Sequence, residues 1–325
     1  MRGLSVFHIA KLYEFSIPWY NTHMQKAYRY RLYPTDEQTQ MMTRIIGCCR
    51  FTYNRLLEYC SKSYKRRGES HTSFDLNNFI CHTLKKAYPW LSDAPAQTLQ
   101  CVSADLSAAF KAFFRKDASY PKYKSKHRSK KSFRVPQRGK VDTEGNRIYV
   151  QGVGWVKAVI HRTPIGRLKN ITVTVNPSGT VYASCLFDDG NEAPASFVPD
   201  NPKVVGVDLN IERLAVCSDG SDYENPRTLK QYEKKLKHLQ RMLSKKKKGS
   251  NNWMKLKKDT AALHEKISNI RKDAVHKMTK QIVCDSQADA IVVEDLNVSG
   301  MMRNGRLSKH IQDASFHEIR RQLEY

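Results

Sequence analysis

Residues 204–210 read VVGVDLN, and residues 290–296 read AIVVEDL. Each stretch is a short apolar run that ends in an acidic side chain, Asp208 in the first and Glu294 in the second. Short apolar runs of this kind are typical of strands that are buried on both faces of a sheet. We therefore expect two strands of one buried sheet, each followed directly by a carboxylate.

The segment between the two runs predicts the rest of this domain. Residues 212–218 (ERLAVCS) predict a further strand, and residues 227–280 predict two helices joined by a turn at 245–252. Apolar residues recur at helical spacing at Leu229, Tyr232, Leu236, Leu239 and Leu243, and then at Leu256, Leu263, Ile267, Ile270, Ala274, Met278 and Ile282. This spacing favours an antiparallel helical hairpin. The order strand, strand, helices, strand indicates an α/β domain over residues 200–325.

Asp208 and Glu294 are the candidate catalytic residues. A carboxylate at the end of a buried strand is costly to desolvate, and sites in α/β sheets form where strands end. Two such carboxylates can hold Mg²⁺, and a pair of Mg²⁺ ions supports the attack of water on a phosphodiester. Alternatively, Asp208 caps the turn that follows it, and Glu294 or Asp295 caps the next helix. The spacing alone does not decide between these interpretations.

The charge of the chain is concentrated in two blocks. The sequence holds 56 Lys and Arg against 31 Asp and Glu, a net charge of +25. Residues 111–140 hold 12 basic side chains and 1 acidic one, and residues 227–280 hold 18 and 4. These blocks account for the whole excess, which indicates that a polyanion is bound in two places.

Aromatic side chains alternate with cations in the first block, at Tyr120, Tyr123 and Phe133. This pattern offers both phosphate contacts and stacking surfaces for unpaired bases. A lysine run such as residues 245–248 is by itself typical of a solvated surface. We predict nucleic-acid binding by Tyr120, Lys122, Tyr123, Lys124, Lys126, Arg128, Lys130, Lys131, Arg134, Lys245, Lys246, Lys247 and Lys248.

The remaining composition excludes several protein classes. The 8 cysteines form no CxxC pair, which argues against a zinc site and a disulfide framework. No apolar run is long enough to span a membrane, and Lys11 and Glu14 interrupt the apolar N-terminus where a signal peptide would need its core. We expect a cytoplasmic, nucleoid-associated protein of prokaryotic type, with neither a membrane nor a small molecule as its partner.

The N-terminal half predicts strands around a helical insert. Residues 25–33 alternate with period two and predict a strand, with Tyr28, Tyr30 and Leu32 on one face. Residues 36–60 and 93–115 predict helices, the second with Asp93 as its cap and Pro95 in its first turn. Residues 147–150, 155–161 and 171–187 predict further strands, and 188–202 predict a linker.

Eight motifs of the chain resemble, in order, the OrfB/TnpB proteins of insertion sequences, which are relatives of type V CRISPR effector nucleases. The motifs are YRYRLYP, GCCRFTYNRLLE, DLSAAFKAFF, YPKYKSKHRSKKSFR, GVDLNIERLAVCSDG, LSKKKKGSNNWMKLKK, IVVEDLNVSGMMRN and LSKHIQDASFHEIRRQLEY. The resemblance covers residues 24 to 325. Residues 1–23 lie outside it, and the usual start would be Met24.

The resemblance implies an α/β multidomain protein encoded by a transposable element. Family members are RNA-guided DNA endonucleases, whose partners are a guide RNA from the element's end and a target DNA. A wedge β-barrel would comprise residues 24–35 and 117–199, with a helical recognition domain inserted at 36–116. An RNase H-like (RuvC) domain would follow at 200–325, with the hairpin as its insertion. Asp208 and Glu294 match the first two RuvC carboxylates, which implies Mg²⁺ as the cofactor.

The chain departs from the family pattern in one respect. In the family, the segment after LEY continues into a zinc ribbon of two CxxC pairs and a third RuvC carboxylate, and this sequence has neither. We therefore expect an incomplete two-metal site, no bound zinc and no efficient cleavage by these 325 residues. A nuclease-dead protein that binds RNA or DNA is the alternative. Direct transposase chemistry is a third hypothesis, although the sequence has no His-x-His pair.

Overall fold

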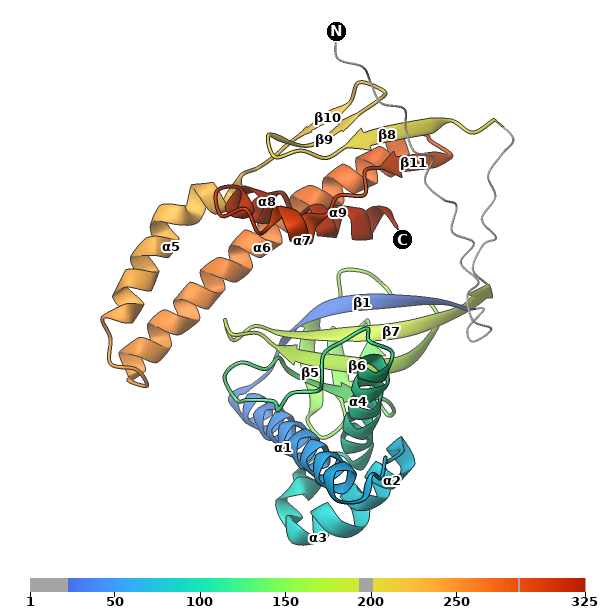
Figure 1. Cartoon of the computed structure of the whole chain (residues 1–325), viewed down its shortest axis with the longest axis vertical. Coiled ribbons are helices and arrows are strands. Elements are labelled where there is room, and N and C mark those ends of the chain that lie inside the picture. The colour runs from blue at the N-terminus through green and yellow to red at the C-terminus, as the bar shows by residue number, and fades with distance from the viewer. Residues whose placement is uncertain (1–22, 193–200, 286, 325) are drawn as a thin grey trace. The chain divides into compact units, whose positions relative to one another are not determined.

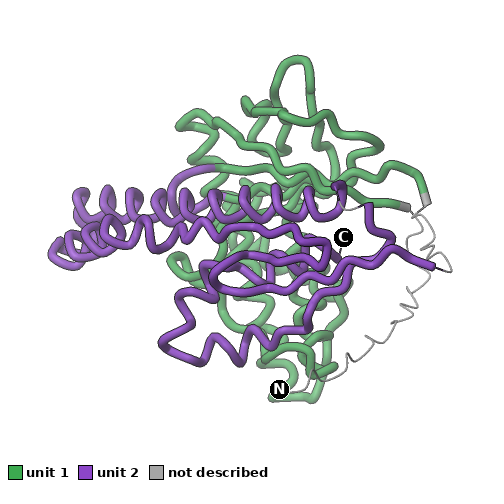
Figure 2. The backbone as a smooth tube through the Cα atoms, turned by 90° about the horizontal axis from the view of Figure 1, so that it is seen from above, with its two compact units in different colours: residues 1–174, 181–194 green, residues 175–180, 195–325 purple. Residues whose placement is uncertain are grey.

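A computed structural model of the protein describes residues 23–192, 201–285 and 287–324. The predicted N-terminal extension and most of the predicted linker lie outside these residues. The chain divides into two units, coloured separately in Figure 2. Unit 1 comprises residues 1–174 and 181–194, and unit 2 comprises residues 175–180 and 195–325.

A seven-stranded sheet forms the framework of unit 1 (Figure 1). Its strands are β1 (His23–Tyr33), β2 (Lys131–Val135), β3 (Lys140–Asp142), β4 (Arg147–Val150), β5 (Gly154–Val159), β6 (Arg167–Val175) and β7 (Val181–Glu192). Their order is β2-β6-β7-β1-β5-β4-β3, so β2 and β3 are the two edges. The sheet is a curled half-barrel, and the complete barrel that we expected is not formed by the described strands.

The faces of β1 follow the predicted alternation. Tyr28, Tyr30 and Leu32 are buried, whereas Arg29 and Arg31 are exposed. Strand β1 pairs antiparallel with β7 on one side and with β5 on the other, so it lies in the centre of the sheet. This burial explains why the alternating pattern alone was enough to predict both the strand and its inward face.

The helices of unit 1 lie between β1 and β2 in the sequence. They are α1 (Asp36–Arg67), α2 (Ser73–Phe79), a π-helix (Ile80–Leu84), α3 (Lys85–Ala87), a 3₁₀-helix (Pro89–Asp93) and α4 (Ala96–Phe114). Thr35 and Gln38 form a capping box at the start of α1. The predicted cap of α4 is wrong. Asp93 ends the 3₁₀-helix, and Pro95 is the N-cap residue of α4, without a side-chain hydrogen bond.

Unit 2 is built on a four-stranded sheet of order β10-β9-β8-β11. Its elements are β8 (Val204–Asp208), β9 (Arg213–Cys217), β10 (Asp222–Glu224), α5 (Thr228–Ser244), α6 (Asn251–Asp285), β11 (Ala290–Val293), α7 (Val298–Met301), α8 (Ser308–Ala314) and α9 (Phe316–Leu323). Strands β8 and β9 are antiparallel, whereas β8 and β11 are parallel. The chain is therefore of mixed α/β class in both units.

One face of this sheet is buried, which corrects the expectation of burial on both faces. Val205 and Val207 pack in a cluster with side chains of α6, α8 and α9. Val204 and Val292 belong to the opposite face and are 48% and 46% exposed. Within the described residues, the helices that contribute to the core of the sheet all reach it from the Val205 side, so alternate residues of β8 stay accessible.

Helices α5 and α6 form the predicted hairpin, with Leu236, Leu263 and Ile267 buried between them. The turn is shorter than predicted, because α6 already begins at Asn251. Across the described ranges, no helix is both long and apolar enough to cross a membrane.

Candidate nucleic-acid and metal sites

The parallel pairing of β8 with β11 brings the two candidate carboxylates to the same level. The register pairs Val204 with Ala290 and continues through Val207 with Val293. Asp208 is the last residue of β8, and Glu294 follows the last residue of β11, so both come from the same end of adjacent parallel strands, which lie about 4.8 Å apart. Both residues are exposed. By strand alternation, Asp208 belongs to the face opposite Val205.

Neither Glu294 nor Asp295 is a helix cap. The Asn297 side chain accepts the Gly300 N–H at 2.9 Å and caps α7. Asp295 pairs with Arg320. The capping hypothesis for these two acids is therefore wrong, because Asn297 already occupies the cap position.

Asp208 is held by one neighbour. The Asn210 amide donates a long hydrogen bond of 3.4 Å to Asp208 Oδ2, and Asn210 Oδ1 accepts the Arg213 N–H at 2.8 Å. Asn210 thus links the Asp208 carboxylate to the turn between β8 and β9. In the described part of the chain, neither Asp208 nor Glu294 has an ion-pair partner, and such exposed carboxylates fit Mg²⁺ as two of its ligands. Among the described residues, no group of three or more His, Cys, Asp or Glu could complete a metal site.

The first basic block is anchored to α1 by the side chain of Asn54. Asn54 Oδ1 accepts the Lys124 N–H at 2.8 Å, and Asn54 Nδ2 donates to the Lys124 carbonyl at 2.9 Å. Further along the segment, the Ser129 hydroxyl accepts the Ser125 N–H at 2.8 Å. These bonds give residues 124–129 a defined course, although the segment has no helix or strand.

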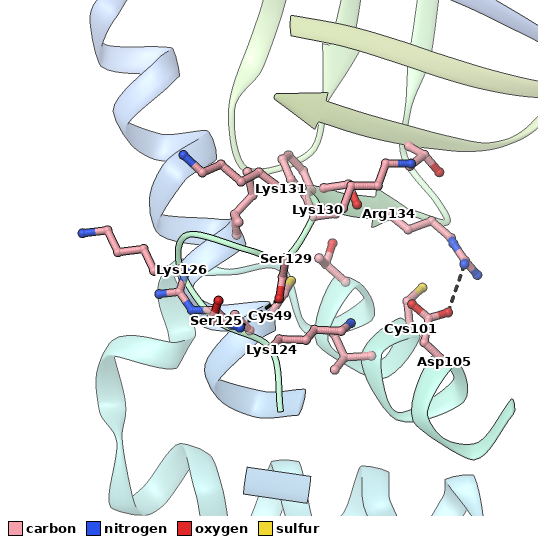
Figure 3. Close-up of a pocket in the computed structure, with 17 residues that line it drawn as sticks. Cys49, Cys101, Asp105, Lys124, Ser125, Lys126, Ser129, Lys130, Lys131 and Arg134 are labelled. Atoms are coloured by element: carbon pink, nitrogen blue, oxygen red, sulfur yellow. Dashed lines mark hydrogen bonds and ion pairs between the residues drawn. The ribbon is translucent and has the colours of Figure 1, made fainter. Parts of the chain in front are cut away.

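A cavity of about 280 Å³ lies between this segment, α1, α4 and the sheet (Figure 3). Lys124 points into the space between the helices, and its Nζ lies 3.8 Å from the centroid of the Tyr53 ring. Burial lowers the pKa of the Lys124 ammonium. Arg134 forms an ion pair with Asp105 at 3.0 Å on the same side of the cavity.

Most of the predicted nucleic-acid contacts are exposed. The exposed side chains are Tyr120, Lys122, Tyr123, Lys126, Arg128, Lys130, Lys131 and Arg134 in the first block and Lys245, Lys246, Lys247 and Lys248 in the turn between α5 and α6. Lys124 is half-buried, and the side chains of the set that line the cavity are Lys124, Lys126, Lys130, Lys131 and Arg134. Tyr120 packs edge-on against Phe110 and Phe113, with its hydroxyl 2.8 Å from that of Ser61. Their contacts with nucleic acid stay a prediction.

Phe133 is not the exposed stacking surface that we predicted. Its side chain is only 4% exposed, because Phe133 faces inward from β2, a strand that was not among the predicted ones. Once β2 is recognised as a strand, its alternation places Phe133 and Val135 inside and Arg134 outside.

Comparison with known sequences gives two family matches. Residues 190–305 match the family OrfB_IS605, described as "Probable transposase". Residues 24–69 match HTH_OrfB_IS605, described as "Helix-turn-helix domain". Over the second range, the structure has strand β1 followed by the single helix α1.

Two curated proteins are similar over most of their length. The chain is 35% identical to "Putative RNA-guided DNA endonuclease InsQ" of Escherichia coli (strain K12), over 92% of this chain and 77% of that protein. It is 31% identical to "Putative RNA-guided DNA endonuclease" of Streptomyces pristinaespiralis, over 93% and 74%. The chain belongs to the OrfB/TnpB family of insertion-sequence proteins.

A search of solved structures finds a Cas12f1 chain in a complex with single-guide RNA and target DNA. The match covers 94% of the OrfB/TnpB chain and 87% of the Cas12f1 chain, with 13% sequence identity and a TM-score of 0.48.

Asn54, Thr98 and Asn210 were not found by the sequence analysis. Thr98 lines the cavity from α4, and the other two hold Lys124 and Asp208. The only available signal for Thr98 was a polar residue beside the apolar stripe of α4. Asn54 gave no signal, because it acts on a residue 70 positions away.

Proposed function

We propose that the chain is an RNA-guided DNA-binding protein whose Asp208 and Glu294 act in metal-dependent phosphodiester cleavage. The parallel pairing of β8 and β11 carries this proposal, because exposed carboxylates stand at the same end of both strands, Asp208 as the last residue of β8 and Glu294 directly after β11. The names of the two curated relatives support guide RNA and target DNA as the partners. The wedge, recognition and RuvC domains of the family are proposed for the predicted residue ranges.

Each side chain of the site has a distinct role in this proposal. Asp208 and Glu294 would hold Mg²⁺, and Asn210 would orient the Asp208 carboxylate through its amide. Bound Mg²⁺ supplies the activation of water and the neutralisation of phosphate charge. The exposed cations of both basic blocks would bind the phosphates of the nucleic acid and hold the strand in place.

A second function is binding without efficient cleavage. It is favoured by the finding that no third acidic or histidine ligand joins Asp208 and Glu294 among the described residues. Hard cations such as Mg²⁺ require near-octahedral coordination by oxygen atoms, and two carboxylates leave most of the coordination positions to water. We therefore propose that the purified 325-residue polypeptide binds guided DNA and cleaves it poorly.

The test separates metal binding, nucleic-acid binding and cleavage. Mn²⁺ is titrated into the wild type, Asp208→Ala and Glu294→Ala, and the bound ion is measured by electron paramagnetic resonance. The same proteins are loaded with RNA transcribed from the element's end, and binding and cleavage of a matching DNA are followed on gels. Both variants should lose Mn²⁺ binding and any residual cleavage while they retain RNA binding.

Asp295→Ala is the matched control, since Asp295 is adjacent in sequence but is paired with Arg320. It should retain Mn²⁺ binding. Wild-type Mn²⁺ affinity in Asp208→Ala would contradict the metal site. Rapid Mg²⁺-dependent cleavage by the purified wild type would contradict the proposal of poor cleavage, and loss of RNA binding by both variants would point to a structural role.

A further inference from the structure

The cavity of unit 1 combines an apolar interior with a cationic rim. Val102 and Phe133 line its interior and are buried. The ammonium groups of Lys126 and Lys131 extend away from it toward solvent (Figure 3). A volume of about 280 Å³ is close to the lower end of small-ligand sites, roughly 300–1,000 Å³. The space therefore suits one small group and is far too small for a duplex.

Thr98 provides an independent indication of a ligand. It lines the cavity and is 1% exposed, and its hydroxyl has no hydrogen-bond partner among the residues that the structure describes. Buried hydroxyl groups are almost always hydrogen-bonded, because leaving one without a partner is unfavourable. The Thr98 hydroxyl can donate to or accept from a polar atom that enters the cavity.

The cations around the cavity define the charge of this ligand. Lys124 lies inside, and Lys126, Lys130 and Lys131 follow it on the same segment. Asp105, the acid of this cavity, is already paired with Arg134. An anionic group is therefore favoured at the rim, next to a group in the interior that offers a polar atom to Thr98.

From this arrangement we infer that the cavity binds one unpaired nucleotide, with the base inside against Thr98 and the phosphate at the lysine rim. The inference rests on the proposed nucleic-acid binding and adds to it a site for a single base turned out of its strand. A base has both the flat apolar faces for the interior and the polar edge for the Thr98 hydroxyl. A free phosphate would satisfy the rim alone and would leave the hydroxyl without a partner.

Thr98→Val is the decisive variant, because it removes the hydroxyl and keeps the shape. Thr52→Val is its matched control, since the Thr52 hydroxyl is also buried and, within the described part of the chain, without a partner, but does not line the cavity. Both variants should melt at or above the wild-type temperature, because each loses an unsatisfied polar group. Affinities are measured for a short single-stranded oligoadenylate RNA, for its DNA equivalent and for an RNA duplex, at several salt concentrations.

The expected result is specific to the single strand. Thr98→Val should bind the single-stranded probe roughly five-fold more weakly, with an unchanged salt slope and unchanged duplex binding. Thr52→Val should bind as the wild type does. Cys101→Phe, which fills the cavity from α4, should weaken single-strand binding by about ten-fold or more. The RNA and DNA probes show which strand supplies the nucleotide.

Three outcomes would overturn the inference. Equal single-strand affinity of Thr98→Val and the wild type would show that the hydroxyl meets no ligand. Equal losses in Thr98→Val and Thr52→Val would assign the effect to the fold. If the wild type bound neither the single strand nor the duplex, the proposed nucleic-acid binding itself would fail. If it bound both probes and Thr98→Val had no effect, only the nucleotide site would be contradicted.

Discussion

The Asn54 amide takes the place of a backbone partner for residue 124. It receives the Lys124 N–H and donates to the Lys124 carbonyl, as a neighbouring strand would. Asn54→Ala should lower the free energy of unfolding by about 1–3 kcal/mol, because two buried backbone groups lose their partners. It should also weaken single-stranded RNA binding without changing the salt slope, since no charge is removed. Thermal melts and filter binding at several salt concentrations measure both effects.

Asn54→Asp is the matched variant for this contact. It retains the acceptor for the Lys124 N–H and loses the donor to the Lys124 carbonyl, so its effect should lie between those of the wild type and Asn54→Ala. Lys126→Ala should behave differently and reduce the salt slope by about one. A reduced slope in Asn54→Ala would contradict a positioning role, because it would mean that phosphate contacts had been lost.

At the scale of elements, α5 is capped by a residue from another helix. Its own N-cap residue, Arg227, has a left-handed backbone and no capping side chain. Asp313 of α8 is 7% exposed, and both of its carboxylate oxygens accept the Leu229 N–H, at 3.0 Å each. Asp313→Ala should cost about 1–3 kcal/mol and speed amide exchange in the first turn of α5, as measured by mass spectrometry. Asp313→Asn should have a smaller effect. Unchanged exchange in Asp313→Ala would refute the cap.

Helix α9 contains a carboxylate whose charge stabilises the fold. Hydrogen bonds from Arg321 and Gln322 lower the pKa of Glu318 to about 2, against the opposing effect of burial. Because the folded pKa lies below the unfolded one, the stabilisation is present above about pH 4.3 and is lost as the pH falls toward 2. Glu318→Gln should therefore cost about 1 kcal/mol at neutral pH and nothing near pH 2. Urea unfolding at both pH values tests this, and an equal loss at both would contradict it.

Elements whose apolar residues repeat with a regular period could be predicted from the sequence. Contacts between residues that are distant in the chain could not. Tyr28 and Tyr30 follow a regular alternation on a central strand, so the pattern gave both strand and face. Val204 belongs to an all-apolar run, and such a run does not tell which face a helix will cover. The cavity was not predictable, because Thr98, Lys124 and Phe133 come from separate segments and meet only through tertiary folding. The apolar runs before Asp208 and Glu294 predicted two strands of one sheet, and β8 and β11 are adjacent and parallel, whereas the joint role of the two carboxylates stays a prediction.

At the scale of the whole molecule, the excess of cations is divided between the two units. The block at 111–140 lies in unit 1, and the block at 227–280 lies in unit 2. Each unit thus carries its own cationic surface, and each should contribute to the salt dependence of binding independently of the other. This separation makes the two surfaces testable one at a time.

The turn between α5 and α6 is where the two interpretations of a lysine run give different predictions. Lys245, Lys246, Lys247 and Lys248 are all exposed. If they contact phosphates, replacing all four by glutamine should reduce the salt slope of RNA or DNA binding by up to about 3, because each contact contributes roughly 0.7–0.9. Replacing all four by arginine should keep the slope, since the charge is retained. If the run is only a solvated surface, the glutamine variant keeps the wild-type slope, and the nucleic-acid contact of unit 2 must then come from the other cations of its hairpin.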